Sequence, residues 1–331
     1  MNYYVAIDSG TTNTRVRLLN DTGVVLDTYK SAVGVKDTAI DGNNKRLQQA
    51  VRMGIEEILA NNAIMKSDIK QIFASGMITS DMGLYELDHL VAPVGLKDLK
   101  NGVKQVMLED VIDIPISFIP GIKNKVDDIS LDTVEEIDIM RGEEVEAIAV
   151  LSQLPRNQAY VLILPGSHTK LVKVDENGKI TGCATTMAGE LLSCITKNTI
   201  ISSAVNQNFV DFVDYDRELV LLGYETAKKV GLSRSIFSAR IINRFIDESA
   251  MKSANYILGA VLQSDIVAIQ NSCALQIDQK TVVVVSGKEP LKSAFMDILQ
   301  YEGCFDQVQQ LEFVEEEHLS AIGAFLIMEG E

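Results

Sequence analysis

The sequence is poor in the residues that build metal centres and covalent cross-links. Its four cysteines form no CxxC pair and no zinc spacing, and its three histidines lie far apart in the chain. We therefore expect reduced, mostly buried thiols, as in a cytosolic protein, and no histidine metal site.

Positive charge and long apolar runs are scarce as well. The chain has 30 Lys and Arg against 46 Asp and Glu, a formal net charge of −16 at pH 7. This balance argues against nucleic acid or an anionic membrane as a partner, and it requires that an anionic ligand be held by local donors. No apolar run is long enough to cross a bilayer, and the first residues enter an expected strand without a signal-peptide pattern. We expect a soluble, cytoplasmic protein.

The common short motifs of nucleotide-binding proteins and hydrolases are also missing. The chain contains no GxxxxGK[ST], no GxGxxG after a strand, no HExxH and no GxSxG. It does have the composition of a globular protein, with 47% apolar and 23% charged residues. Its 331 residues suit two domains of ordinary size.

A short stretch near the N-terminus carries the most informative pattern. The β-prone run 4–7 stops at Asp8, turns at Gly10 and restarts as the alternating run 14–19, which predicts a β-hairpin. Its tip can direct backbone N–H groups at an anion, while Asp8 can hold a hard cation directly or through water. An ordinary hairpin with a polar turn and no ligand could have the same sequence pattern.

The same pattern occurs a second time. Residues 160–170 match residues 4–14 without a gap, although Leu164 stands in place of Asp8. This internal similarity predicts two related domains that each begin with a hairpin. We expect the two hairpins to meet across one crevice, where they would form a clamp for a polyphosphate.

Hydrophobic periodicity predicts the remaining elements. In the first half we expect a helix over 44–61 and strands over 24–30, 70–74 and 114–121. Because of Pro115, the last of these is expected to be an edge strand. In the second half we expect strands over 180–187, 281–285 and 308–314, and helices over 189–203, 210–230, 234–248, 250–273 and 318–329.

An acidic stretch separates the two halves. Residues 123–139 carry six carboxylates and are expected to form a solvated connection. We place the domains at 1–138 and 139–331, with the last helix able to pack back on the first domain.

Two strands end in loops that are expected to reach the crevice. The strand at 70–74 is followed by Gly76, Met77, Ile78, Thr79 and Ser80, and the apolar strand at 281–285 is followed by Ser286 and Gly287. Carboxyl ends of strands supply ligand contacts in open α/β sheets. Plain strand-to-helix turns would look the same.

Two adjacent acids stand at the expected start of a helix. Glu143 and Glu144 follow Arg141 and Gly142, and acids in a first turn complement the helix dipole without any further role. Alternatively, one of them is a proton acceptor at the domain boundary, which the dipole would keep ionised at neutral pH.

These motifs together resemble a known family. A duplicated domain with DSGTTN at residues 8–13 is similar to the acetate and sugar kinase/Hsp70/actin superfamily. Together with residues 76–80, MRGEE at 140–144 and PGSHTK at 165–170 occur in the order found in 2-dehydro-3-deoxygalactonokinases. The resemblance spans nearly the whole chain, and the last two motifs are the specific ones.

Three positions depart from the family pattern. Members often have tryptophan at the place of Ser9 and serine at the place of Thr11. The adenine-side turn, often glycine-rich in related kinases, has only Gly287 after Ser286.

The resemblance implies an α/β fold of two duplicated ribonuclease H-like domains, each a mixed β-sheet with helices on both faces, around a central cleft. It implies ATP-dependent phosphorylation of the 6-hydroxyl of 2-dehydro-3-deoxy-D-galactonate, giving 2-dehydro-3-deoxy-6-phosphogalactonate and ADP, with Mg²⁺ as the cofactor. Phosphoryl transfer needs positioning and charge neutralisation more than covalent chemistry, which suits these residues.

The resemblance also implies residue roles. Asp8 would hold Mg²⁺ and Glu143 would accept the hydroxyl proton, with Glu144 as the alternative base. The implied phosphate contacts are Gly10, Thr11, Thr12, Asn13, Gly166, Ser167, His168 and Thr169, with Lys170 adding positive charge. The implied substrate contacts are Gly76, Met77, Thr79, Ser80 and Arg141, and those on the adenine side are Ser286 and Gly287. Arg141 could equally hold the linker between the domains in place, and His168 could be a turn histidine that makes only a local hydrogen bond.

Two other functions stay open. One is a kinase of the same fold for another sugar or sugar acid. The other is an actin-like or chaperone-like protein that uses ATP to change shape, which the length disfavours because no peptide-binding domain follows residue 331. The stereochemistry of the sugar acid and assembly into a homodimer are also open.

Overall fold

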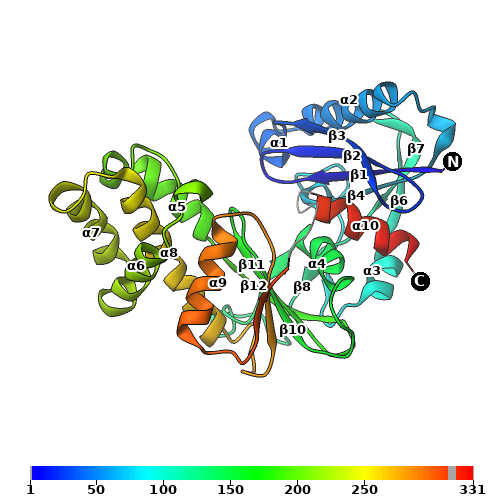
Figure 1. Ribbon diagram of the computed structural model, residues 1–331. Helices are drawn as coiled ribbons and strands as arrows, with labels where there is room; N and C mark the ends of the chain where they lie inside the picture. Colours follow the sequence, from blue (N-terminus) through cyan, green and yellow to red (C-terminus); the bar gives the residue numbers. More distant parts are fainter. Residues whose placement is uncertain (1, 312–317, 331) are drawn as a thin grey trace.

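Two β-sheets form the framework of the protein, and each contains one of the two similar hairpins (Figure 1). The computed structural model describes residues 2–311 and 318–330. The first sheet has the order β3-β2-β1-β4-β7-β6 and comprises β1 (Tyr3–Ser9), β2 (Thr14–Leu19), β3 (Val25–Ser31), β4 (Ile69–Gly76), β6 (Lys104–Leu108) and β7 (Ile112–Phe118). The second has the order β12-β11-β10-β13-β14 and comprises β10 (Tyr160–Leu164), β11 (Thr169–Val174), β12 (Ile180–Thr186), β13 (Val282–Val285) and β14 (Val308–Gln310).

The two sheets share a connection plan. In each, a hairpin is followed by a third antiparallel strand, and a later strand pairs in parallel with the first strand of the hairpin. This arrangement contains the expected repetition of a hairpin and a following strand, and the parallel partner is a further feature that the two sheets share. The strand expected over 308–314 is described only to residue 311, and its remainder lies outside the described residues.

Helices lie on both faces of both sheets. Helices α1 (Val35–Asp41) and α2 (Lys45–Asn61) cover the outer face of the first sheet. The outer face of the second is covered by α5 (Ala188–Asn198), α6 (Arg217–Val230), α7 (Leu232–Phe245), α8 (Ala250–Asn271) and α9 (Leu291–Glu302), of which α6 and α7 lie farthest from the sheet (Figure 1). The expected mixed α/β architecture is thereby confirmed.

A central layer joins the two halves. One hydrophobic core contains the inner faces of both sheets together with α4 (Glu143–Leu151) and α10 (Leu319–Glu329). Helix α10 packs on α4, β1, β4 and α3 (Leu96–Gly102), although it comes last in the chain. At the crossing, a Cβ added to Gly323 would overlap the carbonyl oxygen of Val145, so the two helices approach more closely than a larger residue allows.

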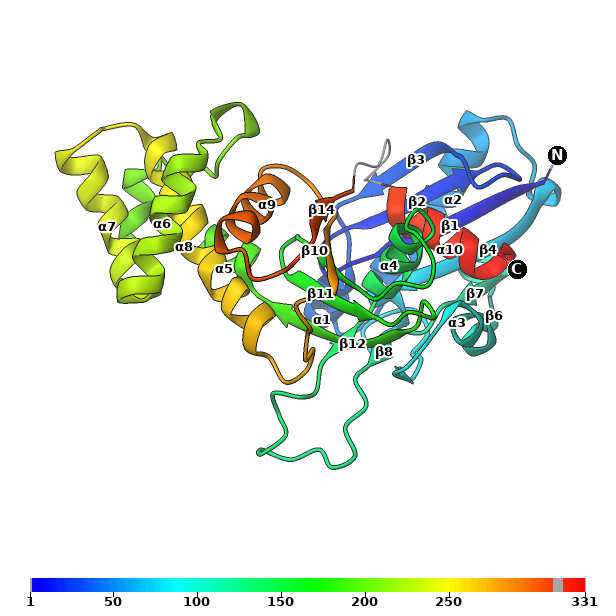
Figure 2. The ribbon, with the colours of Figure 1, turned by 60° about the horizontal axis from the view of Figure 1, so that its bottom comes forward.

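The acidic connection is exposed. It runs between β8 (Ile122–Lys123) and β9 (Ile139–Met140), which form a small sheet with β5 (Leu90–Val91). Figure 2 shows it as a long loop that extends away from both main sheets. Among the described residues, no helix has the length and apolar character needed to span a membrane.

The expectation of an edge strand at 114–121 is wrong. Strand β7 lies between β4 and β6. Pro115 is tolerated there because pairing with β4 begins only at Ile116 and a register shift between Val106 and Leu108 interrupts the ladder with β6 opposite the proline. The missing N–H of Pro115 therefore leaves no partner unpaired in either ladder.

Candidate active site

The tip of the first hairpin presents backbone amides to solvent. The carbonyl oxygens of Gly10 and Thr11 accept hydrogen bonds from the N–H groups of Val35 and Lys36, at 3.2 and 2.9 Å, where α1 begins. In the described part of the chain the N–H groups of Thr11 and Thr12 donate to no protein acceptor, and both residues are exposed. With its carbonyls held by the helix and its amides unoccupied, the tip has the polarity of an anion site.

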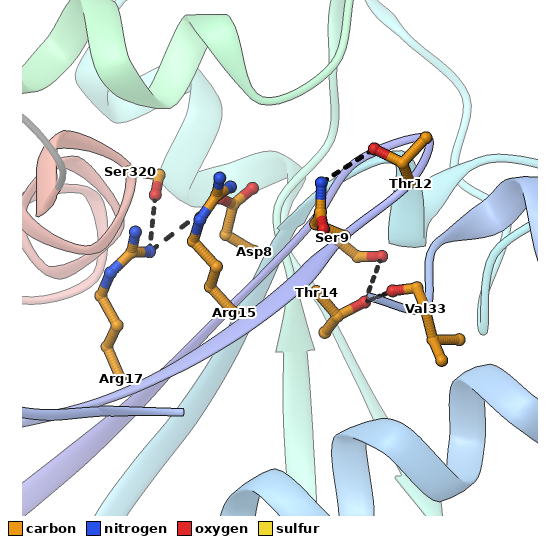
Figure 3. Close-up of polar contacts among 9 residues, drawn as sticks. Asp8, Ser9, Thr12, Thr14, Arg15, Arg17, Val33 and Ser320 are labelled. Carbon is orange, nitrogen blue, oxygen red and sulfur yellow. Dashed lines mark hydrogen bonds and ion pairs between the residues drawn. The ribbon is translucent and has the colours of Figure 1, made fainter. Parts of the chain in front are cut away.

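Two buried hydroxyl groups at the base of this tip hold it in place. Ser9 and Thr14 are paired across the hairpin, and their hydroxyl oxygens lie 2.9 Å apart (Figure 3). The Thr14 hydroxyl donates to the carbonyl oxygen of Val33 at 2.8 Å. Ser9 thus belongs to a polar network that connects the hairpin to the entry of α1.

Asp8 is flanked by two arginines from the neighbouring strand. Its Oδ2 lies 3.4 Å from Nη1 of Arg15 and 3.9 Å from Nη1 of Arg17 (Figure 3). The Arg15 side chain is 39% exposed, whereas that of Arg17 is 2% exposed and donates to Ser320 Oγ of α10 at 3.0 Å. Arg17 therefore links Asp8 to the central layer, and Arg15 stays available to a ligand.

The second hairpin tip is built in the same way. The carbonyl oxygen of Ser167 accepts a hydrogen bond from the N–H of Glu190 at 2.9 Å, at the start of α5, and a Cβ on Gly189 would overlap the carbonyl oxygen of Gly166. Among the described residues, the N–H groups of Ser167 and His168 have no protein acceptor. His168 Nε2 lies 3.6 Å from the Glu190 carboxylate. Both copies of the repeat thus turn amides outward.

Thr169 and Lys170 point to opposite faces of the second sheet. Thr169 is fully buried, and its side chain faces α8 rather than the tip. Lys170 is 5% exposed, and its Nζ donates to the carbonyl oxygen of Ile139 at 2.9 Å and contacts the hydroxyl of Thr185. Any contact of Thr169 with a phosphate would have to come from its backbone, and Lys170 connects the second hairpin to the turn before α4.

That turn touches both hairpins. Gly142, at φ 110°, precedes α4, and a Cβ on it would lie 3.1 Å from Cα of Gly76 at the end of β4. A Cβ on Gly76 would in turn lie 3.2 Å from Oδ1 of Asp8. Lys170 of the second hairpin therefore holds residue 139, and three residues later Gly142 lies against Gly76, which is next to Asp8.

The two candidate bases have different environments. Both carboxylate oxygens of Glu144 accept from the N–H of Gly142, at 2.9 and 2.8 Å, and its side chain is fully buried. Burial, and then the charge of Glu143, raise the pKa of Glu144 to about 8. Glu143 is only half-buried, and its Oε2 accepts from the N–H of Arg141 at 3.1 Å. Only Glu143 is accessible to a substrate.

A third acid, Glu146, joins this group. It lies one turn after Glu143 on α4, so both side chains are on one face of the helix. Burial, followed by the charges of Asp8 and Glu143, raises its pKa, while Arg17 acts in the opposite direction. The Glu146 side chain keeps partial contact with solvent, whereas that of Glu144 is fully buried.

Arg141 holds the loop that follows β4. Its guanidinium donates to the carbonyl oxygen and the hydroxyl of Thr79, at 2.7 and 2.8 Å, and to the carbonyl oxygen of Leu87 at 2.5 Å. Its Nη2 lies 3.4 Å from Nδ1 of His89, whose pKa is lowered to about 4 by burial and by the Arg141 charge. The Ser80 hydroxyl donates to the carbonyl oxygen of Met77 at 2.7 Å. These polar groups shape the loop beside Asp8.

The turn expected on the adenine side lies next to the second hairpin. A Cβ on Gly287 would be 2.9 Å from Cδ of Pro165, because β10 and β13 are parallel neighbours. Ser286 is buried, and its N–H donates to the carbonyl oxygen of Ile163 at 3.0 Å.

Sequence reasoning did not identify Arg15, Arg17, Glu146 and His89. A signal was present for the first three. Arg15 and Arg17 are two residues apart in a strand and so share a face, and Glu146 has helical spacing from Glu143. His89 has no comparable signal, because its position beside Arg141 depends on the packing of distant segments.

Comparisons with known proteins identify the family to which the chain is similar. The family model described as 2-keto-3-deoxy-galactonokinase matches residues 8–322. The curated protein named "Probable 2-dehydro-3-deoxygalactonokinase DgoK1", from Rhizobium meliloti (strain 1021), is 27% identical over 205 residues. That match covers 61% of this chain and 59% of the relative's length. The solved structure named "Crystal structure of a putative 2-dehydro-3-deoxygalactonokinase protein from Sinorhizobium meliloti" has a TM-score of 0.74 at 21% identity, covering 99% of this chain and 100% of that one.

Proposed function

The chain belongs to the 2-keto-3-deoxy-galactonokinase family, and from this premise we propose that it is a sugar-acid kinase. The proposed reaction transfers the γ-phosphoryl group of ATP to the 6-hydroxyl of 2-dehydro-3-deoxy-D-galactonate. The products are 2-dehydro-3-deoxy-6-phosphogalactonate and ADP. The observation that carries the proposal is the turn before α4, which contacts the first hairpin through Gly76 and the second through Lys170. An acid at that turn would lie between two anion-binding tips.

Glu143 is the proposed general base. A proton acceptor has to be ionised and within reach of the substrate hydroxyl. Glu144 meets neither condition, since it is fully buried and its pKa of about 8 keeps most of it protonated at pH 7. Glu143 is half-buried and lies at the N-terminus of α4, where the helix dipole favours the carboxylate.

The two tips are proposed to bind the phosphates. Thr11 and Thr12 on one side, and Ser167 and His168 on the other, offer amides without protein acceptors within the described chain. Arg15 adds a partly exposed positive charge next to the first tip. Because the net charge of −16 repels an anionic ligand, local donors of this kind are needed to bind the phosphates.

Asp8 is the proposed Mg²⁺ ligand. Among residues 2–311 and 318–330, no group of three or more His, Cys, Asp or Glu side chains could hold a metal by itself. This fits Mg²⁺, which usually keeps several waters and uses one or two carboxylates together with substrate phosphates. Bound there, Mg²⁺ would neutralise charge on the transferred phosphoryl group.

The loop from Gly76 to Ser80 is the proposed sugar-acid contact. Because the Arg141 guanidinium is engaged with Thr79 and Leu87, we assign Arg141 to shaping this loop rather than to direct binding of the substrate carboxylate. The galacto stereochemistry rests on family membership. A cytoplasmic location and a homodimer stay predictions.

Two glutamine variants test the proposed base. Glu143→Gln should lower kcat by roughly 10²–10⁴ with nearly unchanged affinity for ADP, because proton acceptance is lost while the phosphate contacts remain. Glu144→Gln is the matched control, one position along the same helix, and should keep kcat within a few fold. Coupled measurement of ADP release and calorimetric ADP titration give the two quantities. Full activity of Glu143→Gln would refute the assignment.

A substrate panel tests the proposed acceptor. ADP release should depend on a 2-keto-3-deoxy sugar acid and be fastest with the galactonate derivative. Higher kcat/KM for another sugar or sugar acid would redirect the proposal to a different kinase of this family. ATP turnover without any acceptor would instead favour a protein that uses ATP to change shape.

A further inference from the structure

Helix α8 carries a buried carboxylate that the proposed reaction does not use. Asp265 is 2% exposed and lies within the apolar stretch of α8 that packs against the second sheet. Its carboxyl faces the hydroxyls of Thr186 and Thr169. A buried carboxylate is costly unless other groups compensate it, so its presence needs a reason.

The two threonines form a pair across adjacent strands. Thr169 on β11 and Thr186 on β12 are register partners, so their side chains stand side by side on the face toward α8. The hydroxyl oxygens of both residues and Oδ2 of Asp265 are buried, and within the described residues none of the three has a partner in hydrogen-bonding geometry. Burial raises the pKa of Asp265 to about 6, against the opposing effect of Thr186 and Thr169. The two hydroxyls therefore face the carboxyl closely enough to lower its pKa by hydrogen bonding, although their geometry falls short of a well-formed hydrogen bond.

The position of this trio matters because it adjoins both the second tip and the start of α5, which holds that tip. Thr169 directly follows His168, and Thr186 leads into α5, whose start holds the Ser167 carbonyl through the N–H of Glu190. A small shift of the tip toward α8 would complete the missing hydrogen bonds. Buried polar groups without partners are uncommon in folded proteins, and a conformational change that provides partners is favoured.

We propose that Asp265 is a positioning residue of the second hairpin, whose carboxyl accepts hydrogen bonds from Thr169 and Thr186 and so fixes the tip in its phosphate-binding geometry. The proposal rests on the proposed function, since it takes the second tip as a phosphate site. Asp265 touches no substrate in this scheme. It acts through the two threonines, which set the direction of the Ser167 and His168 amides.

Replacement of the carboxyl by an apolar group of similar size separates positioning from stability. Asp265→Leu removes the cost of burying a carboxyl but leaves the hydroxyls of Thr169 and Thr186 without an acceptor, so its unfolding temperature should change by only a few degrees. Its KM for ATP should nevertheless rise roughly tenfold or more, since small misplacements at a site reduce binding and turnover strongly. The KM for the sugar acid should stay within about twofold. Asp265→Asn should restore most of the ATP affinity, because an amide can still accept from one hydroxyl and donate to the other.

A second pair of variants serves as a control. Leu262→Ala removes a fully buried side chain from the same helix and should lower stability without changing the KM for ATP. Thr186→Val keeps the shape of the threonine but removes its hydroxyl, and it should raise the KM for ATP in the same direction as Asp265→Leu. This variant keeps the test decisive if Asp265→Leu fails to fold.

The outcomes distinguish the inference from the proposed function. Calorimetric titration of ADP into the full chain and into Gly166→Val reports whether the second tip binds nucleotide. Unchanged ADP affinity in Gly166→Val would overturn the phosphate role of the tip. Weaker binding in Gly166→Val, together with an unchanged KM for ATP in Asp265→Leu and Thr186→Val, would overturn the role of Asp265 alone. An equal rise of the KM in Leu262→Ala would also overturn it, because the effect would then be structural.

Discussion

Glu144 should make the protein less stable as pH rises through neutrality. Its pKa is raised from 4.5 to about 8, chiefly by complete burial. In the unfolded chain the group loses its proton near its ordinary pKa, whereas in the folded protein it keeps the proton until about pH 8. The contribution of the protonated form is therefore fully present below about pH 4.5 and is lost as pH rises toward 8.

The magnitude follows from the two pKa values. At up to 1.36 kcal/mol per pH unit, Glu144 should reduce the free energy of unfolding by roughly 2–3 kcal/mol between pH 5 and pH 7. Glu144→Gln has nearly the same shape, keeps an oxygen that accepts from the Gly142 N–H, and does not titrate. The difference in unfolding free energy, variant minus wild type, should rise by that amount over this interval.

Urea unfolding at pH 5, 6 and 7 measures this difference, because other titrating groups largely cancel between the two proteins. Glu57→Gln, on the exposed side of α2, removes one negative charge without touching a buried site. Its difference should stay within about 0.5 kcal/mol of constant. A flat or falling difference for Glu144→Gln would refute the reasoning, and would mean that the carboxyl reaches solvent or a compensating charge.

Two further substitutions test the central layer and the substrate loop. Gly323→Ala should lower the free energy of unfolding by about 1–3 kcal/mol or more, because its Cβ would overlap the carbonyl oxygen of Val145 and force α4 and α10 apart; unchanged urea unfolding would contradict the close approach. Arg141→Lys should raise the KM for the sugar acid at least about tenfold while the KM for ATP changes little, because lysine cannot span Thr79 and Leu87 together. An equal change in both KM values would contradict a specific role in the loop.

Local patterns predict the parts of the site that depend on neighbours in sequence. The alternating runs around Asp8 and the repeat at Gly166 predict both hairpins, and the acids after Gly142 predict the start of α4. Each of these features is decided within a few residues, by turn chemistry or by capping of a helix. For the same reason the amide-bearing tips could be expected from the sequence.

Features that depend on the packing of segments far apart in the sequence could not be predicted in this way. Pro115 indicates only that its own position lacks a backbone N–H donor. The register shift that accommodates it lies on β6, a strand whose sequence has no clear hydrophobic pattern. Alternation along β11 predicts that Thr169 and Lys170 face opposite ways, but the face that meets Ile139 is set by packing of segments about 30 residues apart. The hydrogen bond between Arg17 and Ser320 likewise depends on the packing of α10.

The hydrogen bond between Arg17 and Ser320 joins residues 303 positions apart and has a consequence for biosynthesis. The ribosome makes the first sheet early, yet α10, which packs against β1 and β4, emerges last. Until then the apolar inner side of the nascent sheet, with Tyr4, Ala6 and Phe73, lacks part of its cover and is a surface that chaperones recognise. The contacts of Arg17 beside Asp8 are therefore completed only after residues 319–329 have been translated.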